Sequence, residues 1–516
     1  MIENTPNKIP QVLQNLLKSI VKIDFKERVY PEYKKLKEQR EALQARLDEH
    51  GKNVQLEAQI KDLVKAMNKP EFHLEKKHYL ITAIEVIEEV AKKHDWDLCK
   101  MNGCIYFYNG EFWEQFDDNS LENFLGEAAL RMGIVKYDAK YYTFRADLVK
   151  QFLCMSYLTE PQLKDNEVNI NLRNGTFTIT RGKYDIKDFD KNDFLMYQLG
   201  FDFDPDAKAP MFQKYLDEVL PDKDCQDILS EYMGYIFLPG MKLEKALILY
   251  GSGANGKSVF FEIMSALVGK ENITNSSLSS LTNSNGYFRA KIANKLLNYA
   301  SEINGKLDTS YFKQMVSGEP VEARLPYKEP FTMKRYARFI FNCNELPKQV
   351  EFTDAYFRRF LIIPFEVTIP PEEQDKDLPN KIIADELSGV FNWVLKGLQR
   401  LQKNVKFTRS EKIDEQVASY RKTSDSVLLF LDDEGYEKSP DKHMKVKDLY
   451  KEYAEYCTDY GYMKLNRKNM KERLKKGQYQ INRLNVGYVV NVTKDKPKEG
   501  EQCKLVLNKA REEMPM

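Results

Sequence analysis

The stretch from Leu247 to Gly269 constrains this chain of 516 residues more than any other part of its sequence. A short apolar run leads into Gly251-Ser-Gly-Ala-Asn-Gly-Lys-Ser258, which matches the phosphate-binding pattern Gly-x-x-x-x-Gly-Lys-Ser/Thr. Apolar residues then recur at helical spacing as far as Val268. This order predicts a buried strand, a loop and a helix, which is the context that a P-loop requires.

The glycines, the lysine and the hydroxyl residue of this loop are the residue types that bind phosphate and Mg²⁺ in a P-loop. Glycine permits backbone conformations in which successive N–H groups point into one concavity at the N-terminus of a helix. In a P-loop these groups hold phosphate oxygens, the lysine reaches the β- and γ-phosphates, and the final hydroxyl binds Mg²⁺. An ordinary glycine-rich turn is the alternative. The nucleotide-binding residues that the motif predicts are Gly251, Ser252, Gly253, Ala254, Asn255, Gly256, Lys257 and Ser258.

The composition is typical of a soluble globular protein, with 30% charged and 42% apolar residues. Because the net charge is only +1, any surface that binds nucleic acid has to be a local patch. The seven cysteines lack zinc-ligand spacing, which favours reduced thiols. No signal peptide is evident, and no apolar run approaches the ~18 residues of a membrane span, so we expect a cytoplasmic protein without a membrane partner.

Changes in residue pattern divide the chain into seven segments. Residues 1–94 predict a helical arm broken at Gly51, either an oligomerisation or partner arm (two antiparallel helices or a short coiled coil) or a solvated helical hairpin. Short strands and turns predict an α+β domain in residues 95–204, with a hairpin around Asn174-Gly175. The other segments are a helical linker (205–240), an ATPase core (241–371), a helical lid or linker (372–423), a winged-helix-like domain (424–493) and a flexible tail (494–516).

Residues 241–371 alternate between predicted strands and helices, which predicts an α/β core with a mainly parallel sheet. Two of the predicted strands end in a polar side chain. Glu302 ends one of them, where a carboxylate can position Mg²⁺ or polarise an attacking water. Asn344 ends the next, where an amide can contact the γ-phosphate or that water, although it could also simply begin a turn. We therefore predict both as catalytic residues, with Glu302 also at the metal.

Two basic stretches lie near these strands. Arg358 and Arg359 precede an apolar strand and fit an arginine finger, which offsets negative charge in the site of a neighbouring subunit. A surface salt bridge with Asp354 is the alternative. Residues 318–338 predict a hairpin that is either solvated or able to follow a phosphate backbone and stack on bases. Its candidate DNA-binding residues are Arg324, Tyr327 and Lys328.

Residues 424–493 contain helices followed by a β-hairpin, a pattern typical of a winged helix. The candidate recognition helix is basic, so on duplex DNA it would contact phosphates and make the affinity depend on salt. A solvated helix face is the alternative. The candidate DNA-binding residues in this segment are Lys464, Arg467, Lys468, Lys471, Arg473 and Lys475.

In this order after the P-loop, Glu302, Arg324, Lys328, Asn344 and the Asp354-x-x-x-Arg-Arg-Phe run resemble superfamily 3 helicases. The resemblance is to the poxvirus-type and phage or plasmid primase-associated branch, over residues 160–500. It implies an AAA+-like ATPase that uses ATP and Mg²⁺ and assembles as a ring, usually a hexamer. It further implies movement along single-stranded DNA from 3′ to 5′.

The same resemblance implies a role for each candidate residue. These are Walker A for Lys257 and Ser258, the Walker B acid for Glu302, sensor 1 for Asn344, the trans arginine finger for Arg359 with Arg358 as second candidate, and a pore hairpin for Arg324 to Lys328. The chain departs from many ATPases in having Ser301-Glu302 where they carry Asp-Glu. In addition, only 94 mostly helical residues precede the middle domain, so we expect no primase activity from this chain alone.

The function that these patterns favour is an ATP-dependent replicative DNA helicase of a phage, plasmid or mobile genetic element. It would act on single-stranded and forked DNA as a homo-oligomer, with a replisome or primase partner. The alternative is a replication initiator or helicase loader that uses ATP as a switch and binds DNA without unwinding it.

Overall fold

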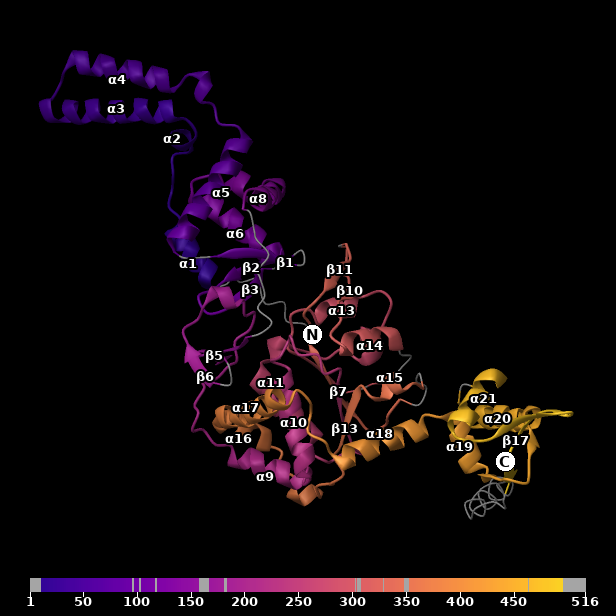
Figure 1. Cartoon of the computed structure of the whole chain (residues 1–516). Coiled ribbons are helices and arrows are strands. Elements are labelled where there is room, and N and C mark those ends of the chain that lie inside the picture. The colour runs from indigo at the N-terminus through magenta and orange to yellow at the C-terminus, as the bar shows by residue number, and fades with distance from the viewer. Residues whose placement is uncertain are drawn as a thin grey trace, which may run out of the picture. The chain divides into compact units, whose positions relative to one another are not determined.

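Figure 1 shows a computed structural model of the chain, whose residues fall into two compact units. The first unit comprises Met1–Asn171 and Gly175–Gln198, and the second comprises Leu172–Asn174 and Leu199–Met516. None of the helices among the described residues has the length and apolarity that crossing a membrane requires. The residues that the structure describes are 11–94, 97–101, 104–116, 118–156, 167–180, 183–301, 303, 308–327, 329–347, 352–462 and 464–494.

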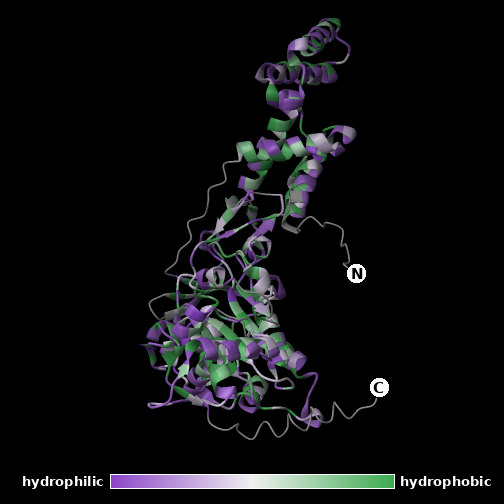
Figure 2. Ribbon diagram, turned by 90° about the vertical axis from the view of Figure 1, so that its right-hand side faces the viewer, coloured by the Kyte–Doolittle hydropathy of each residue, from purple (hydrophilic) through white to green (hydrophobic). Residues whose placement is uncertain are grey.

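The first unit begins with helices. In chain order these are α1 (Gln11–Ser19), α2 (Phe25–Val29), α3 (Pro31–His50), α4 (Val54–Met67), the short η1 (Pro70–Phe72) and α5 (Lys76–Lys93). Helices α3 and α4 lie side by side as a hairpin that turns at Gly51, whose φ is +77° (Figure 1). The side chain of Asn53 caps α4 by accepting hydrogen bonds from two backbone N–H groups. Both hydrophilic and hydrophobic residues occur along these helices in Figure 2, and none of the residues of α3 is buried.

Helices also build the core of the first unit, together with a small antiparallel sheet. Phe107, Leu125 and Leu148 are fully buried in this core. Its further elements are β1 (Leu98–Met101), β2 (Cys104–Tyr108), β3 (Trp113–Phe116), α6 (Asp118–Arg131), α7 (Lys136–Lys140) and α8 (Tyr142–Met155). A second sheet has the order β4 (Val168–Leu172), β5 (Gly175–Thr180) and β6 (Lys183–Lys187). Strands β4 and β5 are adjacent and flank the predicted Asn174-Gly175 turn, which confirms that hairpin.

The second unit is built on a five-stranded parallel sheet, as the sequence predicts. Its strands, from one edge to the other, are β13 (Phe360–Pro364), β7 (Ala246–Tyr250), β12 (Arg338–Cys343), β9 (Leu297–Ala300) and β8 (Ile273–Thr274). Numbered along the chain within this sheet, the order is 5-1-4-3-2. Strands β7 and β13 are continuous apolar runs, and β12 is apolar from Phe339 to Phe341, as expected where both faces of a sheet are covered. In this order the fourth strand, β12, lies directly beside the first, β7. The loop after β7 therefore meets the end of β12.

Helices from before and after the sheet pack together in one layer (Figure 1). They are α9 (Pro210–Val219), α10 (Lys223–Tyr235), α16 (Leu378–Asp385) and α17 (Leu387–Asn404). Helices α10 and α17 approach so closely that a Cβ on Gly397 would lie 2.2 Å from the carbonyl carbon of Ser230. Next to this contact the fully buried carboxylate of Glu231 accepts hydrogen bonds from Arg400 and Thr408. Helices from the two segments 205–240 and 372–423 therefore pack against one another.

The remaining elements of the sheet domain connect its strands. They are α11 (Lys257–Val268), η3 (Lys270–Asn272), α12 (Leu278–Leu281), α13 (Tyr287–Lys291), α14 (Thr309–Val316), the hairpin of β10 (Val321–Ala323) and β11 (Phe331–Met333), and α15 (Asp354–Phe357). The hairpin lies within the predicted range 318–338, so that part of the prediction is confirmed.

Helix α18 (Glu411–Thr423) packs on β13 and leads into a C-terminal domain with its own core around Phe430, Tyr453 and Met470. The order in this domain is one helix, two strands, two helices and three strands, and β15, β17 and β16 form an antiparallel sheet. Its elements are α19 (Ser426–Asp433), β14 (Tyr436–Lys438), β15 (Met444–Lys445), α20 (Val446–Asp459), α21 (Arg467–Lys476), β16 (Ile481–Leu484), β17 (Gly487–Val490) and β18 (Val492–Lys494).

Candidate functional site

The loop between β7 and α11 has the bent backbone that the glycine motif predicts. Gly253 and Gly256 have φ angles of +121° and +83°, and Ala254 between them has +49°. These values lie in the left-handed region, where glycine is favoured. Helix α11 begins directly after Gly256, so the N–H groups of its first turn lie at the loop and have no partners within the helix.

The space around this loop is closed on one side and open on the other. A Cβ on Gly251 would lie 2.1 Å from Nδ2 of Asn255 and 2.4 Å from the carbonyl oxygen of Phe365, so no larger residue fits. By contrast, a Cβ on Gly253 would have no heavy atom within 4 Å. The loop is therefore packed against the protein at its start and leaves room for a bound group at its middle.

Three contacts hold the loop in place. The buried Asn255 donates from Nδ2 to the carbonyl oxygen of Phe365 at 2.9 Å, and the Ala254 carbonyl oxygen accepts from the N–H of Ile369 at 2.8 Å. On the other side, the hydroxyl of Tyr215 on α9 donates to the carbonyl oxygen of Gly256 at 2.8 Å. Sequence reasoning missed these partners because two act through backbone atoms and Tyr215 carries no motif.

Lys257 is a charged residue in this loop that is unusual in being buried. It is only 7% exposed, and its Nζ donates to the carbonyl oxygen of Gly251 at 2.7 Å and to Oδ1 of Asn255 at 2.9 Å. Burial lowers the pKa of its ammonium group. Among the residues that the structure describes, no carboxylate forms an ion pair with it. A buried cation whose partners are neutral oxygens, beside an open loop, fits a bound phosphate group.

The sheet brings one predicted catalytic residue to this loop. The N–H of Gly251 donates to the carbonyl oxygen of Cys343 at 3.2 Å, so Asn344, the next residue, lies at the same edge of the sheet. Asn344 is exposed, whereas Asn342 accepts a hydrogen bond from the hydroxyl of Tyr299 at 3.1 Å. Ser258 is exposed in the first turn of α11. Glu302, the predicted acid and metal ligand, lies outside the described residues.

The two candidate arginines have different environments. Arg359 is buried, and its Nη2 donates to Oγ of Ser317 at 2.9 Å while its Nη1 donates to the carbonyl oxygen of Ala355. The side chain of Arg358 is 63% exposed, and its Nη2 lies 3.3 Å from Oε2 of Glu244. Of these two guanidinium groups, the Arg358 group is the one with substantial access to solvent.

Among the ion pairs of the described residues, none joins Arg358 or Arg359 to Asp354, which was the alternative that the sequence offered. Asp354 instead pairs with Arg421 of α18, at 2.6 Å between Nη2 and Oδ1. The alternative names the wrong partner for Asp354, because α18 places a third arginine, Arg421, within ion-pair distance of this carboxylate.

The tip of the β10–β11 hairpin is exposed. Tyr327 is fully exposed with a φ of +60°, and Arg324 is also exposed. Lys328 lies outside the described residues. The base of the hairpin is held by Arg289, a buried residue that sequence reasoning missed: its Nε donates to the carbonyl oxygen of Glu322 at 2.8 Å, and its guanidinium lies 3.9 Å from the ring centroid of Tyr311.

The basic residues around α21 do not share one environment. Lys464, Arg467, Lys468 and Lys475 are exposed, whereas Lys471 is partly buried with its ammonium 4.0 Å from the ring centroid of Tyr488. Arg473 points toward the sheet domain. Its Nη1 donates to the carbonyl oxygen of Phe352 at 2.9 Å, and burial lowers its pKa.

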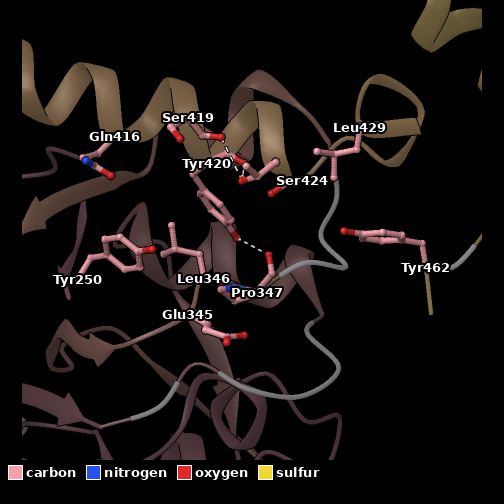
Figure 3. A pocket seen from close by; sticks show the side chains of 11 residues that line it. Tyr250, Glu345, Leu346, Pro347, Gln416, Ser419, Tyr420, Ser424, Leu429 and Tyr462 are labelled. Atoms are coloured by element: carbon pink, nitrogen blue, oxygen red, sulfur yellow. Dashed lines mark hydrogen bonds between the residues drawn. The ribbon is translucent and has the colours of Figure 1, made fainter. Parts of the chain in front are cut away.

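A cavity of about 320 Å³ lies where the sheet domain, α18 and the C-terminal domain meet (Figure 3). Tyr250, which precedes the glycine loop, and Glu345, which follows Asn344, both line it. Within it the hydroxyl of Tyr420 donates to the carbonyl oxygen of Pro347 at 3.0 Å (Figure 3). The segment after Asn344 is thereby attached to α18.

Comparison with known protein families gives two partial matches. Residues 74–221 match the family described as D5 N terminal like, and residues 249–359 match a family of unknown function (DUF5906). The first match covers most of the first unit and the helix α9, and the second runs from the glycine loop to Arg359. Each match covers less than half of the chain.

Two viral proteins are similar in sequence. The protein named "Putative helicase L207/L206" from Acanthamoeba polyphaga mimivirus is 23% identical over 277 residues, which is 50% of this chain and 28% of the relative. "Putative helicase 121R" from Invertebrate iridescent virus 3 is 22% identical over 338 residues, or 56% of this chain and 34% of that protein. The chain thus spans about a third of the length of these relatives. With the D5 match, they support a relationship to D5-like helicases or primases.

Among solved structures, the apo C-terminal region of NrS-1 (305–718) is 13% identical, with a TM-score of 0.43 over 81% of this chain and 99% of that chain. A second apo form of that region has the same TM-score at 12% identity, over 79% of this chain and 98% of that one. Scores at this level carry no argument about fold or function.

Proposed function

We propose that this chain is the motor of an ATP-dependent replicative DNA helicase of the superfamily 3 type, serving a virus, phage, plasmid or other mobile element. The observation that carries the proposal is the buried ammonium of Lys257, which lies beside an open glycine loop at the end of a parallel strand. The viral relatives named as helicases support the same class of activity.

The residues around the loop have distinct parts in this proposal. Loop N–H groups and Lys257 would hold the β- and γ-phosphates of ATP, and the hydroxyl of Ser258 would hold Mg²⁺, which offsets phosphate charge. Glu302 would accept a proton from the attacking water, and Asn344 would orient that water beside the loop. The hydrogen bonds from Tyr215 and Asn255 keep the loop in its bent form before ATP arrives.

The exposure of Arg358 supports this residue as the finger that reaches a neighbouring subunit, since the side chain of Arg359 is buried. A finger acting in trans requires an oligomer, for which we propose the hexameric ring and 3′-to-5′ movement of the resembling family. In such a ring the exposed residues Arg324 and Tyr327 of the hairpin, together with Lys328, would contact single-stranded DNA.

The C-terminal domain would add contacts to duplex or forked DNA. The succession of α20, α21 and the β16–β17 hairpin supports a winged helix, in which α21 would be the recognition helix. Exposed basic residues at Lys464, Arg467, Lys468 and Lys475 support phosphate contacts there. A primase or other replisome protein would act together with this motor.

Strand displacement on forked DNA tests the proposal. Wild-type protein should unwind the fork with ATP, and Lys257→Ala should abolish unwinding because the phosphates lose their buried cation. Lys295→Ala is a matched control, since burial also lowers the pKa of this lysine, which is bonded to a backbone carbonyl away from the loop. Unwinding by Lys257→Ala would refute the site. ATP hydrolysis and DNA binding without unwinding would favour an initiator or loader.

A further inference from the structure

The first unit has an exposed aromatic and basic surface that the proposed motor does not use. Three tyrosines lie within six residues on α7 and the start of α8: Tyr137 is 84% exposed, Tyr141 55% and Tyr142 69%. The rings of Tyr141 and Tyr142 contact each other, with centroids 5.1 Å apart. Lys136 and Lys140 are exposed among them. We call these five residues the tyrosine patch.

The backbone beneath the tyrosine patch is firmly held. Ala139, between the tyrosines, is fully buried, and its carbonyl oxygen accepts from Nε of Arg145 at 3.0 Å. Nη1 of Arg145 donates in turn to Oδ1 of Asn123 at 2.9 Å on α6. Phe144 is buried in the core of the unit directly after the patch. The tyrosines are therefore presented on fixed backbone, so a ligand need not order a loop in order to bind them.

The charge around the tyrosine patch is positive. Residues 131–150 contain five Lys or Arg and two Asp, a net charge of +3, whereas the whole chain has +1. One of the two acids, Asp147, forms an ion pair with Lys76 at 2.7 Å. Lys22, also exposed, lies across Gly133, because a Cβ there would be 3.1 Å from Cγ of Lys22. A polyanion approaching this face would be attracted to it.

This combination distinguishes between two kinds of partner. Protein interfaces are rich in tyrosine, but they are depleted in lysine. Surfaces that bind single strands instead combine cations, which follow the phosphates, with aromatic rings, on which bases stack. Every aromatic residue of the patch is a tyrosine with a lysine within three positions in the sequence. The chemistry therefore favours nucleic acid.

We propose that the tyrosine patch binds single-stranded nucleic acid, with bases stacked on Tyr137 and Tyr142 and phosphates held by Lys136 and Lys140. This site is separate in sequence from the hairpin tip and from α21, and it needs no nucleotide. It extends the proposed helicase by a strand contact in the D5 N-terminal-like segment, and it can be tested independently of the ATP site.

The test measures binding of the full chain to a fluorescently labelled oligothymidine by anisotropy, without nucleotide. We expect Tyr137→Ala with Tyr142→Ala to raise the Kd by at least about 30-fold, because two stacking contacts are lost. Tyr137→Phe with Tyr142→Phe should bind like wild type, since phenyl rings also stack. Lys136→Gln with Lys140→Gln should reduce the slope of log K against log salt by about 1.4. Tyr184→Ala, which removes an exposed tyrosine of β6, is the control.

Wild-type affinity in the double alanine variant would overturn the proposal, and a simultaneous loss of self-association in that variant would reassign the tyrosine patch to a protein contact. Weak binding by the double phenylalanine variant would overturn the stacking assignment. Lys257→Ala should leave this affinity unchanged. If the tyrosine variants bind oligothymidine weakly but the wild-type protein never unwinds DNA, the tyrosine patch is supported and the proposed function is refuted. If the wild-type protein unwinds DNA but the tyrosine variants bind as it does, the proposed function is supported and the tyrosine patch is refuted.

Discussion

Arg473 offers a sharp test, because the sequence predicts it as a DNA contact and the structure places it against the sheet domain. Its Nη1 donates to the carbonyl oxygen of Phe352 at 2.9 Å, and its guanidinium lies 4.0 Å from the ring centroid of the same residue. The guanidinium of Arg421 lies 5.4 Å from that ring. Phe352 thus interacts with two cations, one from α18 and one from α21.

The magnitude follows from these contacts. A hydrogen bond from a charged donor contributes about 1.5–3 kcal/mol. A cation–π contact contributes about 0.5–2 kcal/mol, depending on how far it is desolvated. Removing the side chain also relieves the cost of burying a charge, which offsets part of the sum. We expect Arg473→Ala to lower the free energy of unfolding by about 1–3 kcal/mol.

Denaturant unfolding and DNA-binding titrations on the same variants check this expectation. Arg473→Lys should restore only part of the stability, because an ammonium lacks the planar, forked donors of guanidinium. Lys475→Ala is the matched control on the same helix, since Lys475 is exposed and its neighbour is Glu472 at 3.4 Å. That control should weaken DNA binding and leave stability within about 0.5 kcal/mol.

The reasoning would be refuted by the opposite division of effects. If Arg473→Ala keeps wild-type stability but weakens DNA binding as much as Lys475→Ala does, then Arg473 is a DNA ligand. In that case the contact with Phe352 contributes nothing measurable.

Three further predictions address the motor. Arg358→Ala should abolish ATP hydrolysis in the assembled protein and keep the fold, whereas Arg359→Ala should lower the free energy of unfolding by about 2–3 kcal/mol; equal melting curves for the two variants would contradict this. Gly397→Ala should destabilise the α10–α17 contact by about 1–3 kcal/mol, because the new Cβ would lie 2.2 Å from a backbone atom, and denaturant unfolding with no loss would refute that packing. Burial lowers the pKa of Lys257 in the folded protein. At pH values between this lowered pKa and the ordinary lysine pKa of ~10.4, the unfolded chain therefore binds more protons than the folded chain, and the contribution of Lys257 to the free energy of unfolding rises with pH. Binding of ATP should raise the pKa of Lys257, so the Lys257 amine should take up a proton in the same window and ATP should bind more weakly as pH rises, which calorimetry in buffers of different ionisation enthalpy would detect.

Local patterns in the sequence determined much of this protein. The apolar run, the glycines and the helical spacing predicted β7, the bent loop and α11, because a P-loop motif and its flanking periodicity lie within one continuous stretch. The Asn174-Gly175 turn and the 318–338 hairpin followed from turn chemistry in the same way. These elements depend on neighbours in the chain.

Other features were decided only by tertiary structure. The strand order that puts Asn344 beside Gly251 arises from pairing between β7 and β12, which are about 90 residues apart, and no local pattern encodes such a pairing. The close contact of α10 with α17 likewise joins segments on either side of the sheet.

The fold also decided which individual side chains are exposed and which are buried. Arg358 and Arg359 are adjacent and chemically identical, yet one is exposed and the other is buried against Ser317. Arg473 shares its helix with Lys475, but only the arginine reaches Phe352. Sequence fixes which charges exist. Which of them meet solvent, a partner or a buried carbonyl depends on elements far away in the chain that pack around them.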